Sequence, residues 1–267
     1  MEKQLNKKQR QLKNRLKKMN KAVIAFSGGV DSSFLLAFAY KILGENIIAV
    51  TINSPFISPR ELREAKEFTK TRKIKHKIIN IEMNEMKAIA TNPIDRCYYC
   101  KKLIFSKIKD YAKKENINYV LDASNYNDLN DYRPGMKALK ELGIESPMIN
   151  AGLTKDDIRL LSKDMNLNTW DKPSMACLAS RFPYGTPITF SKLKKVEKSE
   201  AYIQSFGIRQ VRVRYHDEIV TIEVEKNELN LIFKNSNKIT KFIKKLGFKY
   251  VTLDLDGYRT GSLNEDL

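Results

Sequence analysis

The sequence has few cysteines and histidines and no long apolar run. Three cysteines in 267 residues argue against a disulfide framework and leave metal binding, catalysis or packing as their uses. No stretch approaches the ~20 apolar residues that cross a bilayer, and residues 1–20 contain no apolar segment of the kind that a secretory signal needs. We therefore expect a cytoplasmic protein.

Acidic residues are scarce relative to basic ones. The 49 Lys and Arg against 31 Asp and Glu give a net charge of +18. Such a field attracts nucleic acid or small polyanions, and it does not by itself distinguish between them. Most of the excess is lysine on expected helix faces, which we interpret as solvated surface. The N-terminal leucines Leu5, Leu12 and Leu16 have helical spacing, which predicts an amphipathic helix docked on the body of the protein.

The first part of the chain alternates short apolar runs with helical patterns. The expected strands are 22–26, 47–51, 77–81, 119–123 and 147–150, and the expected helices are 32–43, 58–71, 98–115, 134–142 and 154–165. This alternation is typical of a parallel sheet covered by helices. We predict an α/β fold with a doubly wound, mainly parallel sheet, whose ligands bind beyond the carboxyl ends of the strands.

A stretch rich in Pro, Gly and Ser, residues 172–187, interrupts this alternation, and we interpret it as a linker that carries function. Beyond it we expect a helix at 191–206, strands at 210–215 and 219–224, a helix at 227–246 and a strand at 250–255. The pattern predicts two domains. The first spans residues 1–187, and the second, 188–267, is a small α+β domain for substrate binding or oligomerisation.

A loop with two glycines lies between the first expected strand and its helix. Its residues are Ser27, Gly28, Gly29, Val30, Asp31 and Ser32. The glycines let the backbone approach an anion, and the N–H groups at the helix start point at it. Asp31 is suited to hold Mg²⁺ between phosphates. No lysine follows the glycines, so this is not a Walker A loop; the alternative is an ordinary turn capped by Asp31 or Ser32.

The whole string of this loop resembles the PP-loop of the family that contains GMP synthetase, NAD synthetase, asparagine synthetase and tRNA thiolases. The resemblance implies the fold of that family. It also implies that ATP is cleaved between its α and β phosphates, with the loop holding the leaving pyrophosphate and AMP passing to a substrate oxygen.

The cysteines form a pair and a single residue. Cys97 and Cys100 make a C-x-x-C at an expected helix start, and Cys177 lies within the linker. Neither His76 nor His216 is spaced like a zinc partner. Three thiolates fit a 4Fe-4S cluster that leaves one iron open for a sulfur nucleophile. A redox C-x-x-C and buried packing cysteines are the alternatives.

Taken together, the loop, the cysteines and the linker make the chain similar to the LarE family of sulfur transferases, over nearly its whole length. The segments that carry this resemblance are 27–33, 96–101, 124–135, 172–185, 212–217 and 253–262. The family implies that pyridinium-3,5-biscarboxylic acid mononucleotide is adenylated and converted to thiocarboxylates on the way to the nickel-pincer nucleotide. Adenylation is needed because AMP leaves readily under attack by sulfur, whereas a carboxylate oxygen does not.

LarE proteins are of two kinds, and the cysteines distinguish them. Some keep only the cysteine that matches Cys177 and surrender its sulfur; others carry three cysteines and a cluster. This chain matches the second kind. The resemblance therefore implies that Cys97, Cys100 and Cys177 ligate a 4Fe-4S cluster and that the sulfur comes from inorganic sulfide or a sulfur carrier.

The same resemblance assigns the other site residues. It implies that Ser180, Arg181, Arg212 and Arg214 surround the phosphate and carboxylates of the substrate. With Asp31 of the loop, we expect catalytic roles for Cys177, Ser180 and Arg181. Glu200 is expected to position substrate or metal, and the alternative for it is an ordinary exposed helix carboxylate. In the segment 124–135, Asn125 and Asp128 follow a strand end, where the nucleotide or the activated carboxylate is expected, and Arg133 is given a structural role. The alternative for Arg212 and Arg214, which alternate along a strand, is a position facing solvent.

Two other functions compete with this interpretation. A tRNA thiolase shares the PP-loop and can use three cysteines, and the charge of +18 suits it, but we find no zinc-ribbon cysteine pairs and no separate RNA-binding module. An amide-forming synthetase, which delivers ammonia to an adenylate, leaves the three cysteines unexplained. We therefore expect ATP, Mg²⁺ and a cluster as cofactors, and a homo-oligomer. The expected partner is a small mononucleotide, with nucleic acid as a less favoured partner and no membrane.

Overall fold

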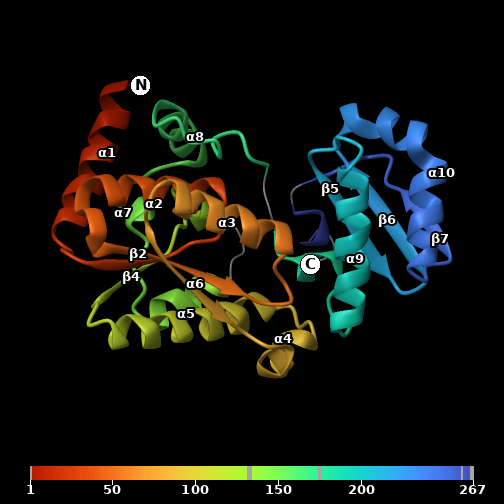
Figure 1. The fold of residues 1–267 in the computed structure, drawn as a ribbon, viewed down its shortest axis with the longest axis horizontal. Helices are drawn as coiled ribbons and strands as arrows, with labels where there is room; N and C mark the ends of the chain where they lie inside the picture. The colour runs from red at the N-terminus through yellow and green to blue at the C-terminus, as the bar shows by residue number, and fades with distance from the viewer. Residues whose placement is uncertain (1, 131–133, 174–175, 260, 265–267) are drawn as a thin grey trace. The chain divides into compact units, whose positions relative to one another are not determined.

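The computed structural model describes residues 2–130, 134–173, 176–259 and 261–264, which form two compact units (Figure 1). The first comprises Met1–Ile89 and Asp95–Ser174, and the second comprises Ala90–Ile94 and Met175–Leu267. The sequence pattern predicts a domain boundary at residue 187, later than this division. The segment after Cys177 belongs to the second unit because Phe182 is fully buried there and its ring lies 5.0 Å from that of Tyr215.

The first unit is built on a four-stranded parallel sheet. Its strands β1 (Ala22–Ala25), β2 (Ile47–Asn53), β3 (Lys75–Asn80) and β4 (Tyr119–Leu121) lie in the order β3-β2-β1-β4. The residues of β2 are almost all buried, as expected for a strand covered on both faces. Along the chain, β2 and β3 are added on one side of β1, and β4 is then added on its other side. The topological switch point, where ligands bind in such sheets, therefore lies between β1 and β4.

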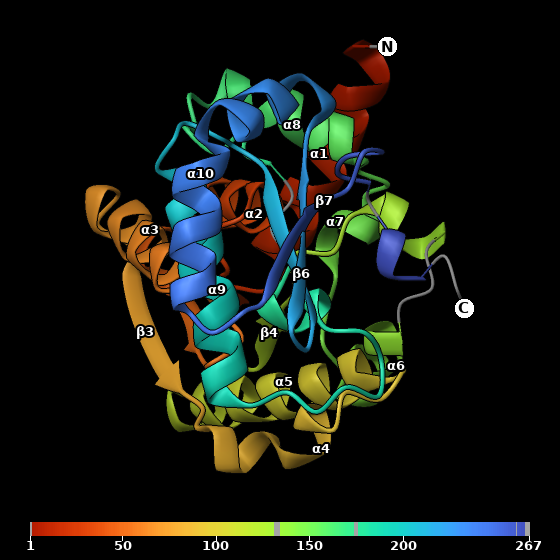
Figure 2. The ribbon, with the colours of Figure 1, turned by 90° about the vertical axis from the view of Figure 1, so that its right-hand side faces the viewer.

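Helices cover both faces of this sheet (Figures 1 and 2). Their bounds are α1 Glu2–Lys17, α2 Val30–Leu43, α3 Pro59–Thr71, α4 Lys87–Ala90, α5 Arg96–Lys114, α6 Pro134–Glu141, α7 Pro147–Asn150 and α8 Lys155–Asp164. One large apolar cluster joins α1, α2, α3, α7 and α8 to the sheet, with Leu16 and Phe34 fully buried at its centre. The helices α5 and α6 lie on the opposite face. The predicted doubly wound α/β fold is confirmed.

The predicted strand at residues 147–150 is wrong. The chain makes a single parallel bridge from Glu145 to Leu121, and the next residues form the short helix α7. Pro147 occupies the first turn of that helix, where its missing N–H and fixed φ are tolerated. Proline cannot donate to a sheet ladder, so the apolar run continues as helix and buries Met148 in the core.

The second unit has a three-stranded sheet with helices on one face (Figure 2). Its elements are α9 Phe190–Gln204, β5 Val211–His216, β6 Ile219–Val224, α10 Leu229–Lys245 and β7 Tyr250–Leu253. The strands β5 and β6 form an antiparallel hairpin, while β7 pairs in parallel with β6 after the crossover through α10. Val211 and Val213 are fully buried toward the core, so Arg212 and Arg214 point to the other face of the sheet.

Candidate active site

The turn between β1 and α2 has the backbone of an anion-binding loop. Gly28 has a φ of +75°, a conformation that favours glycine. Gly29 is the N-cap of α2, and no side-chain hydrogen bond caps the helix there. The hydroxyls of Ser27 and Ser32 lie 3.0 Å apart beside the turn. The first N–H groups of α2 can therefore serve a ligand, which is not the arrangement of an ordinary side-chain-capped turn.

Asp31, in the first turn of α2, has one paired and one unpaired carboxylate oxygen. Its Oδ2 accepts a hydrogen bond from Lys155 Nζ at 2.5 Å. Its Oδ1 is buried and has no hydrogen-bond partner among the described residues. A buried carboxylate oxygen without a partner is costly, and Mg²⁺ prefers such oxygen ligands. The residues of the loop therefore fit the magnesium ion that accompanies a nucleoside triphosphate.

A second lysine contacts the loop backbone. Lys172 Nζ donates to Gly28 O at 2.8 Å and to Glu64 Oε2 at 2.6 Å, and Arg60 Nε donates to Glu64 Oε1 at 2.7 Å. Burial by itself would raise the pKa of Glu64, but the hydrogen bonds and charges of Lys172 and Arg60 together hold it below its usual value. We did not predict Lys155, Lys172 or Glu64 as residues of this site. The only signal was the position of Lys172 at the start of the linker.

A buried carboxylate organises the end of β4. Asp122 is 4% exposed and accepts from Ser124 N at 3.2 Å and Ser124 Oγ at 2.5 Å, and also from Ser146 Oγ. Lys101 Nζ, on α5, lies 3.6 Å from Asp122 Oδ2. This group links the start of α5 to the strand that borders the switch point. No sequence pattern singled out Asp122.

Asn125 and Asp128, which the family resemblance assigns to nucleotide binding, are both buried and brace the turn after β4. Asp128 Oδ2 accepts from Asn125 N at 3.0 Å, and Asn125 Oδ1 accepts from Asn127 N at 3.0 Å. These contacts fix the short 3₁₀ helix Tyr126–Asn130. Nucleotide binding by these residues stays a prediction, and Arg133 lies outside the described residues.

Cys97 and Cys100 lie at the start of α5, as predicted. Their spacing of three residues places both on one side of the helix, with Cys97 exposed and Cys100 half-buried. The start of α6 packs closely here: a Cβ at Gly135 would lie 2.8 Å from Lys101 Cδ and 3.3 Å from Cys97 O. A larger residue would have to displace the Lys101 side chain, so the small Gly135 lets α6 pack closely on the cysteine turn.

In the second unit, Arg181 fixes the turn that carries Cys177. Arg181 is 3% exposed, and it donates to both carboxylate oxygens of Glu200, Nε to Oε1 at 2.8 Å and Nη2 to Oε2 at 3.0 Å. Its Nη1 donates to Ala176 O at 2.8 Å and Cys177 O at 3.1 Å. Glu200 Oε1 also accepts from Val213 N at 3.0 Å. The thiol of Cys177 is exposed at the surface of this braced turn.

Arg214 and Arg212 do not face solvent, so that alternative is wrong. Arg214 makes two hydrogen bonds with Glu223, at 2.7 and 2.8 Å, and donates to Ser180 O at 2.6 Å and Ser262 Oγ at 2.8 Å. Arg212 is 6% exposed, and its guanidinium lies 5.2 Å from the centre of the Tyr258 ring. The arginines thus form part of an ordered polar layer over the sheet.

The electrostatic surroundings of Arg212 favour an anion. Burial, and then the nearby guanidinium of Arg181, lower the pKa of Arg212, while Glu200 raises it by a smaller amount. A phosphate or carboxylate beside Arg212 would offset both unfavourable contributions.

The described part of the chain contains neither a ready metal-ligand cluster nor a membrane span. No group of three His, Cys, Asp or Glu side chains there has an arrangement that could hold a metal ion. The assignment of a cluster to Cys97, Cys100 and Cys177 stays a prediction. Within the same ranges, no helix has the length and apolar character needed to span a membrane.

A parallel sheet with an uncapped glycine turn at its switch point, and an open carboxylate oxygen beside it, defines a nucleotide-binding enzyme of the PP-loop class. The family model for NAD synthase matches residues 4–96. A subunit of the glutamine-hydrolysing GMP synthase of Saccharolobus solfataricus is 26% identical over 55% of this chain and 44% of its own.

Two relatives match almost the whole chain. An uncharacterized protein of Synechocystis is 38% identical over 93% of this chain and 94% of its own length. Pyridinium-3,5-bisthiocarboxylic acid mononucleotide synthase of Lactiplantibacillus plantarum is 35% identical over 94% of this chain and 92% of its own. The chain therefore belongs to the LarE family, that of the Lactiplantibacillus enzyme.

Proposed function

We propose that this protein is an ATP-dependent sulfur transferase that adenylates the carboxylates of pyridinium-3,5-biscarboxylic acid mononucleotide and converts them to thiocarboxylates. The observation that carries the proposal is the uncapped loop at Gly28 and Gly29, beside an Asp31 oxygen with no partner among the described residues. The kinship with an enzyme named for the bisthiocarboxylic product supports the choice of substrate.

The first half-reaction uses the loop, Asp31 and Lys155. The N–H groups at the start of α2 bind the β and γ phosphates of ATP, and Asp31 would hold a Mg²⁺ ion that neutralises charge on the leaving pyrophosphate. A substrate carboxylate oxygen attacks the α phosphorus, and the bond from that phosphorus to pyrophosphate breaks. Lys155, which is 2.5 Å from Asp31, is placed to exchange its carboxylate partner for a phosphate oxygen.

In the second half-reaction a hydrosulfide attacks the carbonyl carbon of the acyl adenylate. The carbon–sulfur bond forms, the bond to the AMP oxygen breaks, and the proton of the hydrosulfide goes to solvent. Arg212 would bind the phosphate or a carboxylate of the substrate, while Arg181 and Glu200 hold the Cys177 turn in one conformation.

We assign Cys97, Cys100 and Cys177 as the ligands of a 4Fe-4S cluster. The donor set fits, because it consists of three thiols, two of them exposed and two within one helical turn. When bound, the cluster would supply an open iron site that presents the sulfide to the adenylate. Inorganic sulfide or a sulfur carrier would replace each sulfide that is transferred. The protein is expected to work as a homo-oligomer.

The function is tested by anaerobic turnover with ATP, Mg²⁺, sulfide and the biscarboxylic mononucleotide. We expect AMP, pyrophosphate and thiocarboxylate in equal amounts. Release of ADP and phosphate, or product formation with ammonia in place of sulfide, would contradict the proposal. The ultraviolet-visible spectrum of the anaerobically purified protein, with iron and sulfide counts, tests the cluster separately, and Ser variants at Cys97, Cys100 and Cys177 should each lose it.

A further inference from the structure

The helices α1 and α2 enclose a basic groove away from the loop at Gly28. The groove has a volume of about 680 Å³. It is lined by Asn6, Gln9, Arg10, Lys13 and Lys17 of α1, by Phe38, Lys41 and Ile42 of α2, and by Met165. It therefore contains four cations and two amides, and no acidic side chain lines it.

None of the four cations has an ion-pair partner among the described residues. No ion pair or hydrogen bond joins the side chains of Arg10, Lys13, Lys17 or Lys41 to another described residue. In the same helix Arg15 pairs with Glu145 at 2.6 Å, and Lys8 pairs with an aspartate of α8, also at 2.6 Å. These pairs and the buried leucines dock α1 on the body, so the backbone that carries the groove cations is held in place.

We propose that this groove binds the phosphate backbone of a nucleic acid, as a partner in addition to the small substrate of the active site. Arg10 and Lys17 are seven residues apart on a helix, which is about 10 Å, so the cations along α1 can contact neighbouring phosphates of one strand. Lys41 supplies a cation from the opposite wall. Lysine, arginine, asparagine and glutamine are the side chains that contact phosphate and sugar in such complexes.

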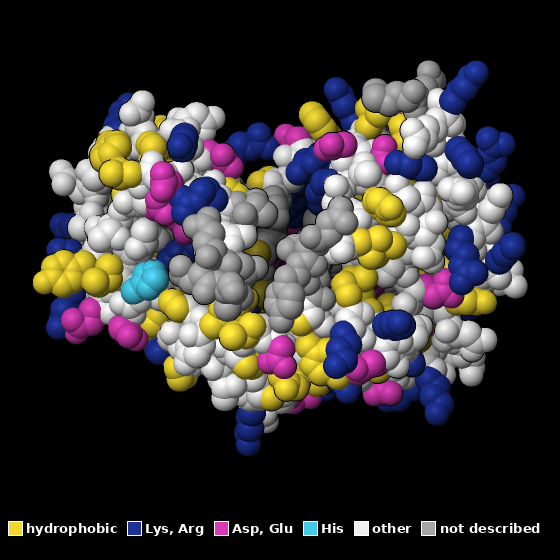
Figure 3. Space-filling view, turned by 180° about the vertical axis from the view of Figure 1, so that it is seen from behind, with side chains coloured by type: hydrophobic (Ala, Val, Ile, Leu, Met, Phe, Trp, Pro, Cys, Tyr) yellow, Lys and Arg dark blue, Asp and Glu magenta, His cyan; other side chains and the backbone are white. Residues whose placement is uncertain are grey.

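The apolar floor of the groove argues against an amphipathic acidic helix as the partner. Phe38 is only 6% exposed, and Ile42 and Met165 are half-buried, so little apolar surface is available to anchor side chains. For the same reason Phe38 cannot stack on a base. Binding is therefore electrostatic and independent of sequence. Lys and Arg side chains are spread over the face drawn in Figure 3, with fewer Asp and Glu among them, and they add a general attraction.

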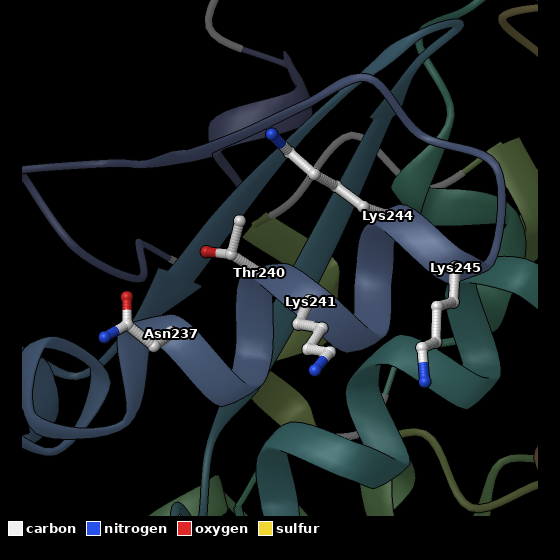
Figure 4. Close-up of a pocket in the computed structure, with 5 residues that line it drawn as sticks. All are labelled: Asn237, Thr240, Lys241, Lys244 and Lys245. Atoms are coloured by element: carbon white, nitrogen blue, oxygen red, sulfur yellow. The ribbon is translucent and has the colours of Figure 1, made fainter.

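A second basic surface, on α10, does not have this geometry. It is lined by Asn237, Thr240, Lys241, Lys244 and Lys245, all from one helix. Figure 4 shows that Lys244 points away from Lys241 and Lys245, so the three ammonium groups do not converge on one ligand. The groove between α1 and α2 has two walls and is the stronger site.

The test measures binding of a fluorescein-labelled oligouridine of about 20 nucleotides by anisotropy, from about 50 to 200 mM salt. The test variant replaces all four groove cations by Gln. A control variant removes the same number of exposed lysines elsewhere, so that both carry the same net charge; its positions are Lys70, Lys87, Lys113 and Lys140.

We expect the groove variant to bind at least about tenfold more weakly at low salt. A plot of log affinity against log salt should also become less steep, by about 3, because four contacts are lost and each single-strand phosphate contact contributes ~0.7 to the slope. The control should lose far less. Sulfur transfer should be unchanged in both, which separates this proposal from the function of the active site. Equal losses in the two variants would overturn the proposal, as would displacement of the oligonucleotide by equimolar inorganic tripolyphosphate, which would identify a small-anion site.

Discussion

Lys155 and Asp31 are paired at 2.5 Å across the start of two helices, although 124 residues separate them in the chain. The pair occupies one oxygen of the carboxylate and leaves the other without a partner among the described residues. The loop is thus set for a cation that Asp31 can bind and for an anion that Lys155 can bind.

Asp31→Asn should abolish release of pyrophosphate, because an amide cannot supply the charge that Mg²⁺ needs. The measurement is pyrophosphate release under saturating ATP. Near-normal activity of the Asn variant would remove Asp31 from the magnesium site.

Lys155→Met should raise the KM for ATP by about tenfold or more, which corresponds to the loss of a charged hydrogen bond of roughly 1.5–3 kcal/mol.

Glu200→Ala should destabilise the protein strongly. It would leave the Arg181 guanidinium, which is 3% exposed, without its carboxylate, and breaking one side of a buried pair costs about 3–5 kcal/mol. Calorimetric unfolding of the variant measures this loss. Lys249→Ala is the matched control, since it removes a cation from an exposed pair with Glu218 and should change stability by less than about 1 kcal/mol. Similar effects in both variants would show that the Arg181 pair does not brace the Cys177 turn.

Arg212→Ala should raise the KM for the mononucleotide about tenfold or more with a smaller effect on kcat, because it removes a charged contact made by the bound substrate. Steady-state kinetics with the mononucleotide as varied substrate measure this change. Arg212→Lys should recover part of the loss, because it keeps the charge but not the planar geometry. An unchanged KM in the Ala variant would place Arg212 outside the substrate site.

Stability should fall in mild acid because of His76. Burial, and then the charge of Lys66, lower the pKa of His76 from 6.5 to about 4, and its ring bonds Thr69 Oγ1 at 2.9 Å and Thr51 Oγ1 at 2.8 Å. Between these two pH values the unfolded chain takes up a proton that the folded protein does not. The stabilisation is therefore complete above pH 6.5 and lost as the pH falls toward 4.

A pKa difference corresponds to ~1.36 kcal/mol per unit, which sets an upper limit on the contribution of His76. Because the ring is only half-buried, solvent screens the effect, and we expect His76 to contribute about 1–2 kcal/mol of the loss. Unfolding of the protein and of His76→Gln, followed between pH 4 and 7, gives the contribution by difference. Parallel curves for the two proteins would show that the His76 pKa is close to its ordinary value.

The protein should turn over repeatedly with sulfide, and its mass should not change, if Cys177 is a cluster ligand. Intact-protein mass spectrometry before and after turnover makes this measurement. Conversion of Cys177 to dehydroalanine would lower the mass by about that of one H₂S and limit each chain to one sulfur. A mass loss in step with product would refute delivery of sulfur from a cluster and leave the assignment of the loop intact.

The sequence alone determined the features that depend on neighbouring residues. The spacing of apolar residues predicted the four strands of the parallel sheet and most of their helices, because strand and helix periods are local properties of the chain. It also predicted a strand at 147–150, which is a helix. The string around Gly28 predicted the loop, since the backbone needs a residue that accepts positive φ before an uncapped helix start. The C-x-x-C at Cys97 was correctly placed at the start of a helix. In each case the cause and its effect lie within one turn or strand.

Only the tertiary structure decided which side chains meet. Lys172 reaches Gly28, and Lys155 reaches Asp31, across more than 120 residues, and no local pattern marks either lysine. Alternation along β5 showed that Arg212 and Arg214 share a face, but strand periodicity does not reveal what covers that face. Burial and ion pairing depend on which elements the fold brings together. The sequence therefore specified the loop, whereas the tertiary structure determined that Lys155 and Lys172 contact it.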